Sequence, residues 1–147
     1  MLNPDYKEIL SILQSNNVEF LLVGAYALAI HGFPRATGDI DIFVKPDNDN
    51  AEKLYRALKI FGTPLRNISP VDFISPGIVL QIGVAPRRID IITSIDGLTF
   101  DEASVGVEKI QIEDLSIPVI SRKNLIANKL ATGREKDKLD AENLMKE

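Results

Sequence analysis

Two aspartates, Asp39 and Asp41, lie one residue apart in the apolar segment 37–44, TGDIDIFV. Side chains alternate along a β-strand, so both carboxylates would face the same side. Neighbouring carboxylates repel, and removing them from water is costly unless a cation compensates. Mg²⁺ prefers such oxygen ligands, and two ions about 3.5–4 Å apart can hold both oxygens of a phosphoryl displacement. The pair therefore predicts a metal site; the alternative is an exposed edge strand whose aspartates face water.

A glycine turn precedes this pair. In the segment 20–30, FLLVGAYALAI, an expected strand ends at Val23, and an expected helix opens after Gly24. The start of a helix presents free backbone N–H groups to an anion such as a triphosphate. Tight turns also need glycine, so the turn alone is weak evidence. Followed at short range by Asp39 and Asp41, it indicates a phosphate site beside a metal site.

A third carboxylate, Asp90, lies in the segment 87–93, RRIDIIT, isolated among isoleucines. It would complete a three-carboxylate site, and the alternative is an exposed position on a half-buried strand. Asp72 and Asp96 are poorer candidates because their surroundings are turn-like.

These residues carry a family resemblance. The run VGAYALAIHGFPRATGDIDIFV resembles the nucleotidyltransferase superfamily of the DNA polymerase β type. Its signature is an apolar residue, Gly, Gly or Ser, a spacer, and Asp-apolar-Asp or Asp-apolar-Glu. The His-Gly and Arg-x-Thr steps at 31–37 are similar to small bacterial and archaeal nucleotidyltransferases. Some of those lie near the toxins of abortive-infection toxin–antitoxin systems.

A second match is C-terminal, where LIANKLATGREKDKLDAENL resembles the Lys…Arg-x-Lys-Asp…Asp helical motif of the same group. The resemblance implies that Asp39, Asp41 and Asp90 are the catalytic metal ligands. It further implies a nucleotide-binding set: Gly24, Ala25, Arg35, Thr37, Lys129 and Asp137. In this set Gly24 and Ala25 would form the phosphate turn. Lys129 would reach the phosphates, and Asp137 would organise the site. Ala25 departs from the pattern, because it lacks the hydroxyl that a serine would offer to the triphosphate.

Several polar residues have alternative roles. Arg35 either pairs with a phosphate or bridges to Asp39, and Thr37 is expected to cap the entry to the strand. We expect a neutral structural or positioning role for His31, the sole histidine. Lys129 either extends to a nucleotide or bends its charged end into water. The stretch 134–137 could also be a charged outer face, on which Lys136 and Asp140 are spaced for an i,i+4 pair.

The composition is that of an ordinary globular protein. The chain has 147 residues, a length that we interpret as one domain, with 121–147 as its C-terminal helical segment. The net charge of −4 argues against binding nucleic acid through broad phosphate attraction. The longest apolar run is too short for a bilayer, the N-terminus lacks signal-peptide features, and cysteine is absent. We therefore expect a cytoplasmic protein without a membrane partner.

The expected elements alternate between helices and strands. The expected helices begin after Asn3, near residue 25, after Asp47 or Asn48, near Phe100, after Ser121 and beyond Gly133. The helix after Ser121 would run to Thr132. The last helix would be amphipathic, with Leu139 and Leu144 on its buried face. The expected strands cover 20–23, 39–44, 78–84, 88–92, 110–112 and 117–120. This order predicts an α+β fold, a small mixed β-sheet with flanking helices and a C-terminal helical pair.

The sequence thus predicts a nucleotidyltransferase that uses Mg²⁺ or Mn²⁺ and an NTP. It would transfer a nucleoside monophosphate to an acceptor hydroxyl of RNA, protein or a small molecule and release pyrophosphate. A toxin-like role and an antitoxin partner rest on the resemblance alone. The alternative is a nucleotide-binding or partner-binding module of the same fold with little or no catalysis, which Ala25 makes credible.

Overall fold

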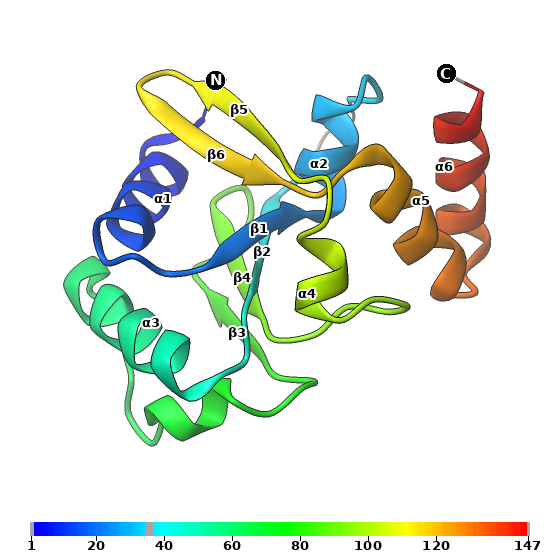
Figure 1. Cartoon of the computed structure of the whole chain (residues 1–147). Coiled ribbons are helices and arrows are strands. Elements are labelled where there is room, and N and C mark those ends of the chain that lie inside the picture. Colours follow the sequence, from blue (N-terminus) through cyan, green and yellow to red (C-terminus); the bar gives the residue numbers. More distant parts are fainter. Residues whose placement is uncertain (1, 35–36, 147) are drawn as a thin grey trace.

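A mixed β-sheet forms the centre of the fold (Figure 1). The computed structural model describes residues 2–34 and 37–146. Within them, six strands pair in the order β3-β4-β2-β1-β6-β5. The strands are β1 (Phe20–Val23), β2 (Asp39–Val44), β3 (Val79–Ile82), β4 (Arg88–Ile92), β5 (Glu108–Ile112) and β6 (Leu115–Val119). The β2–β4 and β1–β6 pairs are parallel, and the other pairs are antiparallel.

Helices surround the sheet. They are α1 (Pro4–Ser15), α2 (Gly24–Ile30), α3 (Asn48–Phe61), α4 (Phe100–Ala103), α5 (Arg122–Ala131) and α6 (Glu135–Met145), with a 3₁₀ turn at Pro70–Phe73. Of these, α1, α3 and α5 begin at the expected capping residues. The side chains of Asn3, Asp47 and Ser121 each accept a backbone N–H at the start of α1, α3 and α5. In Figure 1, α5 and α6 form a pair on the opposite side of the molecule from α1 and α3. The predicted α+β fold with a C-terminal helical pair is therefore confirmed.

The apolar core fixes which face of β2 carries the aspartates. Ile40 and Ile42 are fully buried, while Phe43 packs edge-on against Phe100 of α4 with ring centroids 5.1 Å apart. Because side chains alternate along a strand, Asp39 and Asp41 share the face of Phe43. The two carboxylates therefore lie on the same side of the sheet as α4.

Helix α1 is tied to the start of β4 through a buried phenol. Tyr6 Oη donates to the carbonyl oxygens of Pro86, at 3.2 Å, and Arg88, at 3.0 Å. Burial is the main cause that raises the pKa of Tyr6 to about 12, so the phenol stays protonated at neutral pH. These bonds hold the backbone at Arg88, two residues before Asp90.

Some sequence-based boundaries were wrong. The strand expected over 78–84 ends at Ile82, because Gly83 adopts φ +72° and turns the chain. The hairpin strands are longer than expected and pair as far as Glu108 with Val119. Leu139, assigned to the buried face of the last helix, is 59% exposed, while Leu144 is fully buried as expected.

Among the described helices, none combines the length and apolar character needed to cross a membrane.

Candidate active site

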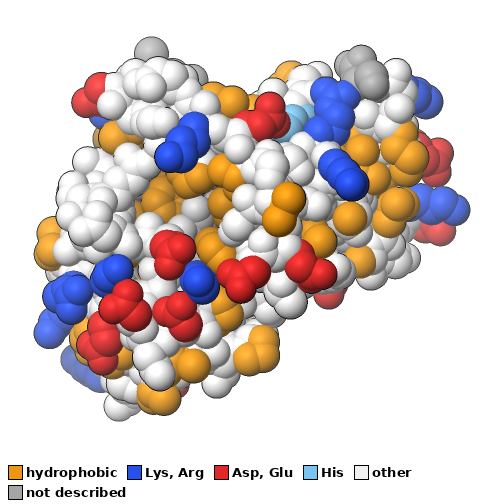
Figure 2. Space-filling view, in the orientation of Figure 1, with side chains coloured by type: hydrophobic (Ala, Val, Ile, Leu, Met, Phe, Trp, Pro, Cys, Tyr) orange, Lys and Arg blue, Asp and Glu red, His pale blue; other side chains and the backbone are white. Residues whose placement is uncertain are grey.

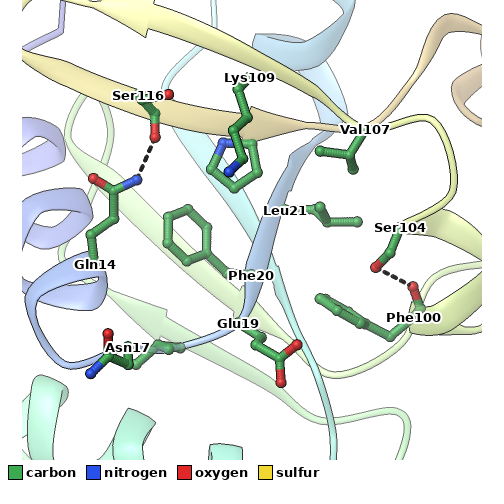
Figure 3. A pocket seen from close by; sticks show the side chains of 12 residues that line it. Gln14, Asn17, Glu19, Phe20, Leu21, Phe100, Ser104, Val107, Lys109 and Ser116 are labelled. Carbon is green, nitrogen blue, oxygen red and sulfur yellow. Dashed lines mark hydrogen bonds between the residues drawn. The ribbon is translucent and has the colours of Figure 1, made fainter.

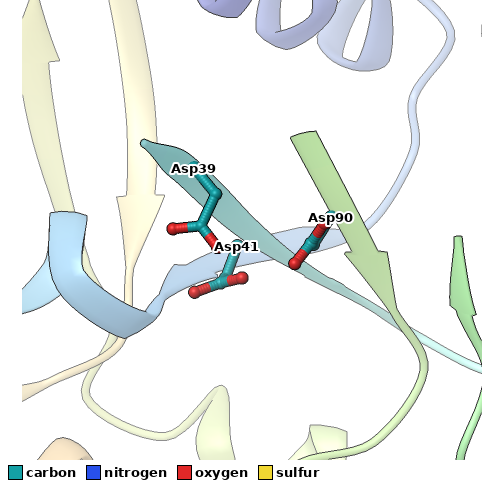
Figure 4. Close-up of side chains that lie close together, drawn as sticks. All are labelled: Asp39, Asp41 and Asp90. Carbon is teal, nitrogen blue, oxygen red and sulfur yellow. The ribbon is translucent and has the colours of Figure 1, made fainter. Parts of the chain in front are cut away.

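The three sequence-predicted carboxylates lie together across two neighbouring strands (Figure 4). Asp41 of β2 and Asp90 of β4 are direct partners in the parallel register. One carboxylate oxygen from each of Asp39, Asp41 and Asp90 lies within 4.8 Å of the others. Asp90 is buried at 7% exposure, so the alternative of a solvent-exposed strand position was wrong for it. The fold thus brings the predicted trio to one point.

Arg88, which was not among the predicted site residues, bridges two members of this trio. Arg88 Nη2 donates to Asp39 Oδ2 at 2.9 Å and to Asp90 Oδ2 at 2.8 Å. Its Nε donates to Asp90 Oδ1 at 3.1 Å, so Asp90 is held by a two-pronged contact. The signal was present in the sequence, because residues two apart on a strand share a face.

Burial and the neighbouring carboxylates act on the pKa of Asp41. Burial, followed by the negative charges of Asp39 and Asp90, raises its pKa from 3.8 to about 6. The positive charges of Arg88 and Lys129 partly oppose this shift. At neutral pH the site therefore holds a carboxylate that gains from any added cation.

The glycine turn packs directly against Asp41. Gly24 adopts φ +69°, in the left-handed region, and a Cβ added there would overlap Asp41 Oδ2. Val23, one residue earlier, is the antiparallel partner of Asp41 in the β1–β2 ladder. The predicted phosphate turn, Gly24 with Ala25, thus lies beside the predicted metal ligands at the start of α2.

Thr37 lies at the entry to β2, as predicted. Its Oγ1 donates to Asp39 Oδ1 at 2.8 Å and is 3.4 Å from the Asp39 backbone nitrogen. This contact orients the first carboxylate of the pair. Arg35, the other predicted nucleotide ligand of this loop, lies outside the described residues.

Lys129 of α5 is held by two carboxylates of α6. Its Nζ lies 3.2 Å from Asp137 Oδ1 and 3.4 Å from Asp140 Oδ2, and its side chain is only 12% exposed. Its charge lowers the pKa of Asp41, which places it within electrostatic reach of the carboxylate cluster. Asp137 thus contacts Lys129 directly, and its role in organising a nucleotide site stays a prediction.

Two further contacts hold Asp137. Thr132 Oγ1 and Arg134 Nε each lie 2.8 Å from its Oδ2. Burial acts to raise the pKa of Asp137, but the bond from Thr132 and the charge of Lys129 outweigh it, and the pKa is lowered. The contact of Asp140 with Lys129 was not predicted, because the i,i+4 spacing favoured a pair between Asp140 and Lys136. In the structure Asp140 is 4% exposed beside Lys129, whereas Lys136 lies on the surface. The spacing of three residues from Asp137 was the available signal, since it places both on one helical face.

His31 occupies a structural position between α2 and β6. Its Nε2 lies 2.8 Å from the carbonyl oxygen of Ile120, and its Nδ1 lies 3.5 Å from a carboxylate oxygen of Glu108. Because a carbonyl oxygen only accepts, Nε2 carries a hydrogen. His31 is 8% exposed, and its Nε2–H donates to the backbone, in keeping with the predicted positioning role.

A hollow lies at the start of β1, the end away from Gly24 (Figure 3). Its volume is about 550 Å³, and its lining includes Phe20, Leu21 and Phe100, with Glu19 and Lys109 as the charged members. Figure 2 shows it as a depression with a hydrophobic floor beside α1 and the β5–β6 hairpin. It is separate from the carboxylate cluster, so cavity size alone does not locate the chemistry here.

The donor set at the cluster fits a hard divalent cation. It consists of carboxylate oxygens, with two from adjacent same-face positions and one from the paired strand. Mg²⁺ and Mn²⁺ favour such ligands. Burial, together with the charges of Asp39 and Asp90, raises the pKa of Asp41, so a cation bound there would stabilise its ionised form.

Comparison with known families agrees with this geometry. The model of the AbiEii family, described as a nucleotidyl transferase toxin of a type IV toxin–antitoxin system, matches residues 9–139. The chain belongs to the AbiEii family. This membership confirms the resemblance drawn from the two sequence motifs and places the chain among nucleotidyltransferase enzymes.

Solved structures share the fold of this AbiEii-family chain. TM1012 from Thermotoga maritima, assigned as a nucleotidyltransferase, has 20% identity and a TM-score of 0.62 over 99% of this chain and 94% of that one. The lincosamide antibiotic adenylyltransferase LnuA, bound to lincomycin, has 17% identity and a TM-score of 0.57, with 99% and 97% covered. The antibiotic-resistance factor ANT(2'')-Ia has 14% identity and a TM-score of 0.58, with 95% and 80% covered. A search among curated proteins found no match.

Proposed function

We propose that this AbiEii-family protein transfers a nucleoside monophosphate from an NTP to an acceptor hydroxyl and releases pyrophosphate in a metal-dependent reaction. The observation that carries the proposal is the convergence of Asp39, Asp41 and Asp90 within 4.8 Å beside the Gly24 turn. Asp39, Asp41 and Asp90 would hold divalent cations, Mg²⁺ or Mn²⁺. Such cations, when bound, neutralise phosphate charge and lower the pKa of a hydroxyl nucleophile.

The residues of the chain supply binding and orientation. Gly24 and Ala25 open α2 beside Asp41, where their backbone can approach the triphosphate closely. Lys129 would neutralise phosphate charge, and Asp137 with Asp140 hold its ammonium group in place. Thr37 orients Asp39 through its hydroxyl. No histidine base is required, and His31 is occupied by the Ile120 carbonyl.

The acceptor is the open part of the proposal. The family description supports a toxin with a cognate antitoxin, and RNA and protein are the acceptors that we propose for such a toxin. The fold neighbours LnuA and ANT(2'')-Ia support a small-molecule acceptor, since their structures hold lincomycin and adenylyl-2''-tobramycin. All three acceptor classes therefore enter the test.

The test is a labelled-transfer screen. The protein is incubated with each α-³²P-labelled NTP and Mg²⁺ or Mn²⁺, and with total RNA, cell protein or small hydroxyl compounds. We expect label on one acceptor class, with transfer abolished by Asp41→Asn and Asp90→Asn. Asp96→Asn, at an exposed turn aspartate, is the matched control and should retain transfer. Tight binding of Mg²⁺–NTP without transfer to any acceptor would instead favour the non-catalytic binding module.

A further inference from the structure

Four of the six carboxylate oxygens of the cluster have a donor among the described residues. Both oxygens of Asp90 and Oδ2 of Asp39 accept from the Arg88 guanidinium, and Oδ1 of Asp39 accepts from Thr37. Among the described residues, Asp41 accepts no hydrogen bond. Arg88 thus occupies two of the three carboxylates at the predicted cation position, while the third, Asp41, packs against the Gly24 turn.

We propose that Arg88 is a resident counter-cation, which holds the carboxylate cluster together in the metal-free protein and competes with divalent cations for Asp39 and Asp90. This inference rests on the proposed function, because it concerns the same carboxylates. It assigns Arg88 a positioning role that neither the motif resemblance nor the family match provides.

Electrostatics explains why such a residue is needed. Asp39, Asp41 and Asp90 would repel one another in the absence of any cation, and Asp90 is buried. Arg88 bridges Asp39 of β2 to Asp90 of β4 with one nitrogen, so it links the two strands at the site. Its planar, permanently charged group suits simultaneous contacts with two carboxylates.

The anchoring of Arg88 allows its side chain to leave without disturbing the strand. Its backbone N–H donates to the Gly38 carbonyl at 3.2 Å, and its carbonyl accepts from Tyr6. The side chain, by contrast, is 35% exposed and has a route to solvent. A divalent cation that takes oxygens of Asp39 and Asp90 must therefore displace only the guanidinium, and the backbone stays in register.

The test measures metal binding rather than activity. Mn²⁺ is titrated into the nucleotide-free protein at pH 8 by isothermal calorimetry, for wild type, Arg88→Met, Arg88→Lys and Arg87→Met. Arg87 is the matched control, because it is the adjacent exposed arginine and pairs with Asp5. We expect Arg88→Met to bind Mn²⁺ about tenfold more tightly than wild type, and Arg88→Lys to lie between them, because lysine keeps the charge but loses the fork. Arg87→Met should match wild type.

Thermal unfolding gives a second readout. In EDTA, Arg88→Met should melt about 2–4 °C below wild type, because three carboxylates lose their counter-cation. Saturating Mn²⁺ should close this gap. Equal or weaker Mn²⁺ binding by a folded Arg88→Met overturns the Arg88 assignment while leaving the metal site intact. If Arg88→Met fails to fold, Arg88→Lys decides, and wild-type affinity in that variant overturns the assignment. Absence of Mn²⁺ binding by wild type and every variant overturns the proposed metal site and this inference together.

Discussion

The Asp41 carboxylate lies directly against Gly24 and leaves no room for a methyl group on residue 24. A Cβ at Gly24 would overlap Asp41 Oδ2 and lie 3.0 Å from Asp41 Cγ. The same glycine adopts φ +69°, which costs a residue with a Cβ about 1–2 kcal/mol. The turn and the proposed metal ligand are therefore built as one unit, and a substitution in the turn acts on the carboxylate.

This relationship predicts that Gly24→Ala lowers nucleotidyl transfer at least tenfold, because Asp41 must rotate away from the cluster. Mn²⁺ affinity should fall with the rate. Gly32→Ala is the matched control, since Gly32 has φ +103° but no atom within 4 Å of an added Cβ. It should lose similar stability from backbone strain and keep its activity. The idea is wrong if both variants lose transfer equally, since backbone strain would then explain the effect.

The raised pKa of Asp41 predicts that Asp41→Asn stabilises the metal-free protein. A carboxyl whose folded pKa is about 6 and whose unfolded pKa is 3.8 binds protons more tightly when folded. Its ionisation therefore lowers stability as pH rises from about 4 to 6, and the loss stays constant above that window. We expect the variant to be more stable than wild type by about 3 kcal/mol at pH 8 in EDTA, and equal to it near pH 4.

Urea denaturation at several pH values measures this difference. Asp96→Asn serves as the control and should show no such pH window. A wild-type protein that is more stable than Asp41→Asn at pH 8 without metal would show that the cluster is adequately compensated. With saturating Mn²⁺ the order should reverse, since only the wild type keeps its full set of proposed ligands.

The carboxylate trio was predictable because each member carries a local signal. Asp39 and Asp41 are marked by strand alternation, and Asp90 by its isolation among isoleucines. Arg88 was not predicted as a bridge, because its contact with Asp39 depends on the register between β2 and β4, two strands far apart in sequence. Registers of this kind are set by tertiary packing rather than by local pattern.

In the C-terminal helix α6, by contrast, the local sequence pattern predicted contacts that the structure does not show. A local pattern there favoured a pair between Lys136 and Asp140 and a buried Leu139, but the packing of α6 against α5 turns Asp140 toward Lys129 and Leu139 outward. Leu144 keeps its predicted place in the core. A helix rich in charged residues leaves its buried face undetermined until the partner helix is known, since several rotations bury similar apolar area.

The contact of Lys129 with two buried carboxylates predicts a double effect for Lys129→Met. The substitution takes a buried positive charge away from Asp137 and Asp140, although Asp137 keeps its contact with Arg134, and should cost about 3 kcal/mol of stability. The KM for the NTP should rise as well, because a phosphate partner is lost. Lys136→Met, on the exposed face of the same helix, should change neither quantity.

The pH dependence of Lys129→Met provides an independent check. The pKa of Asp137 lies below its ordinary value of 3.8, so its ionised form stabilises the wild type above about pH 4 and this contribution is lost as pH falls through the folded pKa. The stability difference between wild type and variant should therefore shrink in acid. A constant difference from pH 7 down to pH 3 would show that the lysine acts through packing alone.

The hydrogen bond from His31 to Ile120 predicts that this histidine stabilises the fold without taking a proton from the acceptor. His31→Ala should lose about 1–3 kcal/mol, since the buried Ile120 carbonyl is left without its donor. His31→Gln, whose amide can still donate, should recover part of that loss. At a temperature where both variants are folded, kcat should stay within about threefold of wild type, which is under 1 kcal/mol in activation free energy. A general base would behave differently, because its removal lowers kcat by about 10²–10⁴. Comparing kcat and the urea midpoint of the two variants separates these roles, and a large fall in kcat for a stably folded His31→Gln would assign His31 to the chemistry.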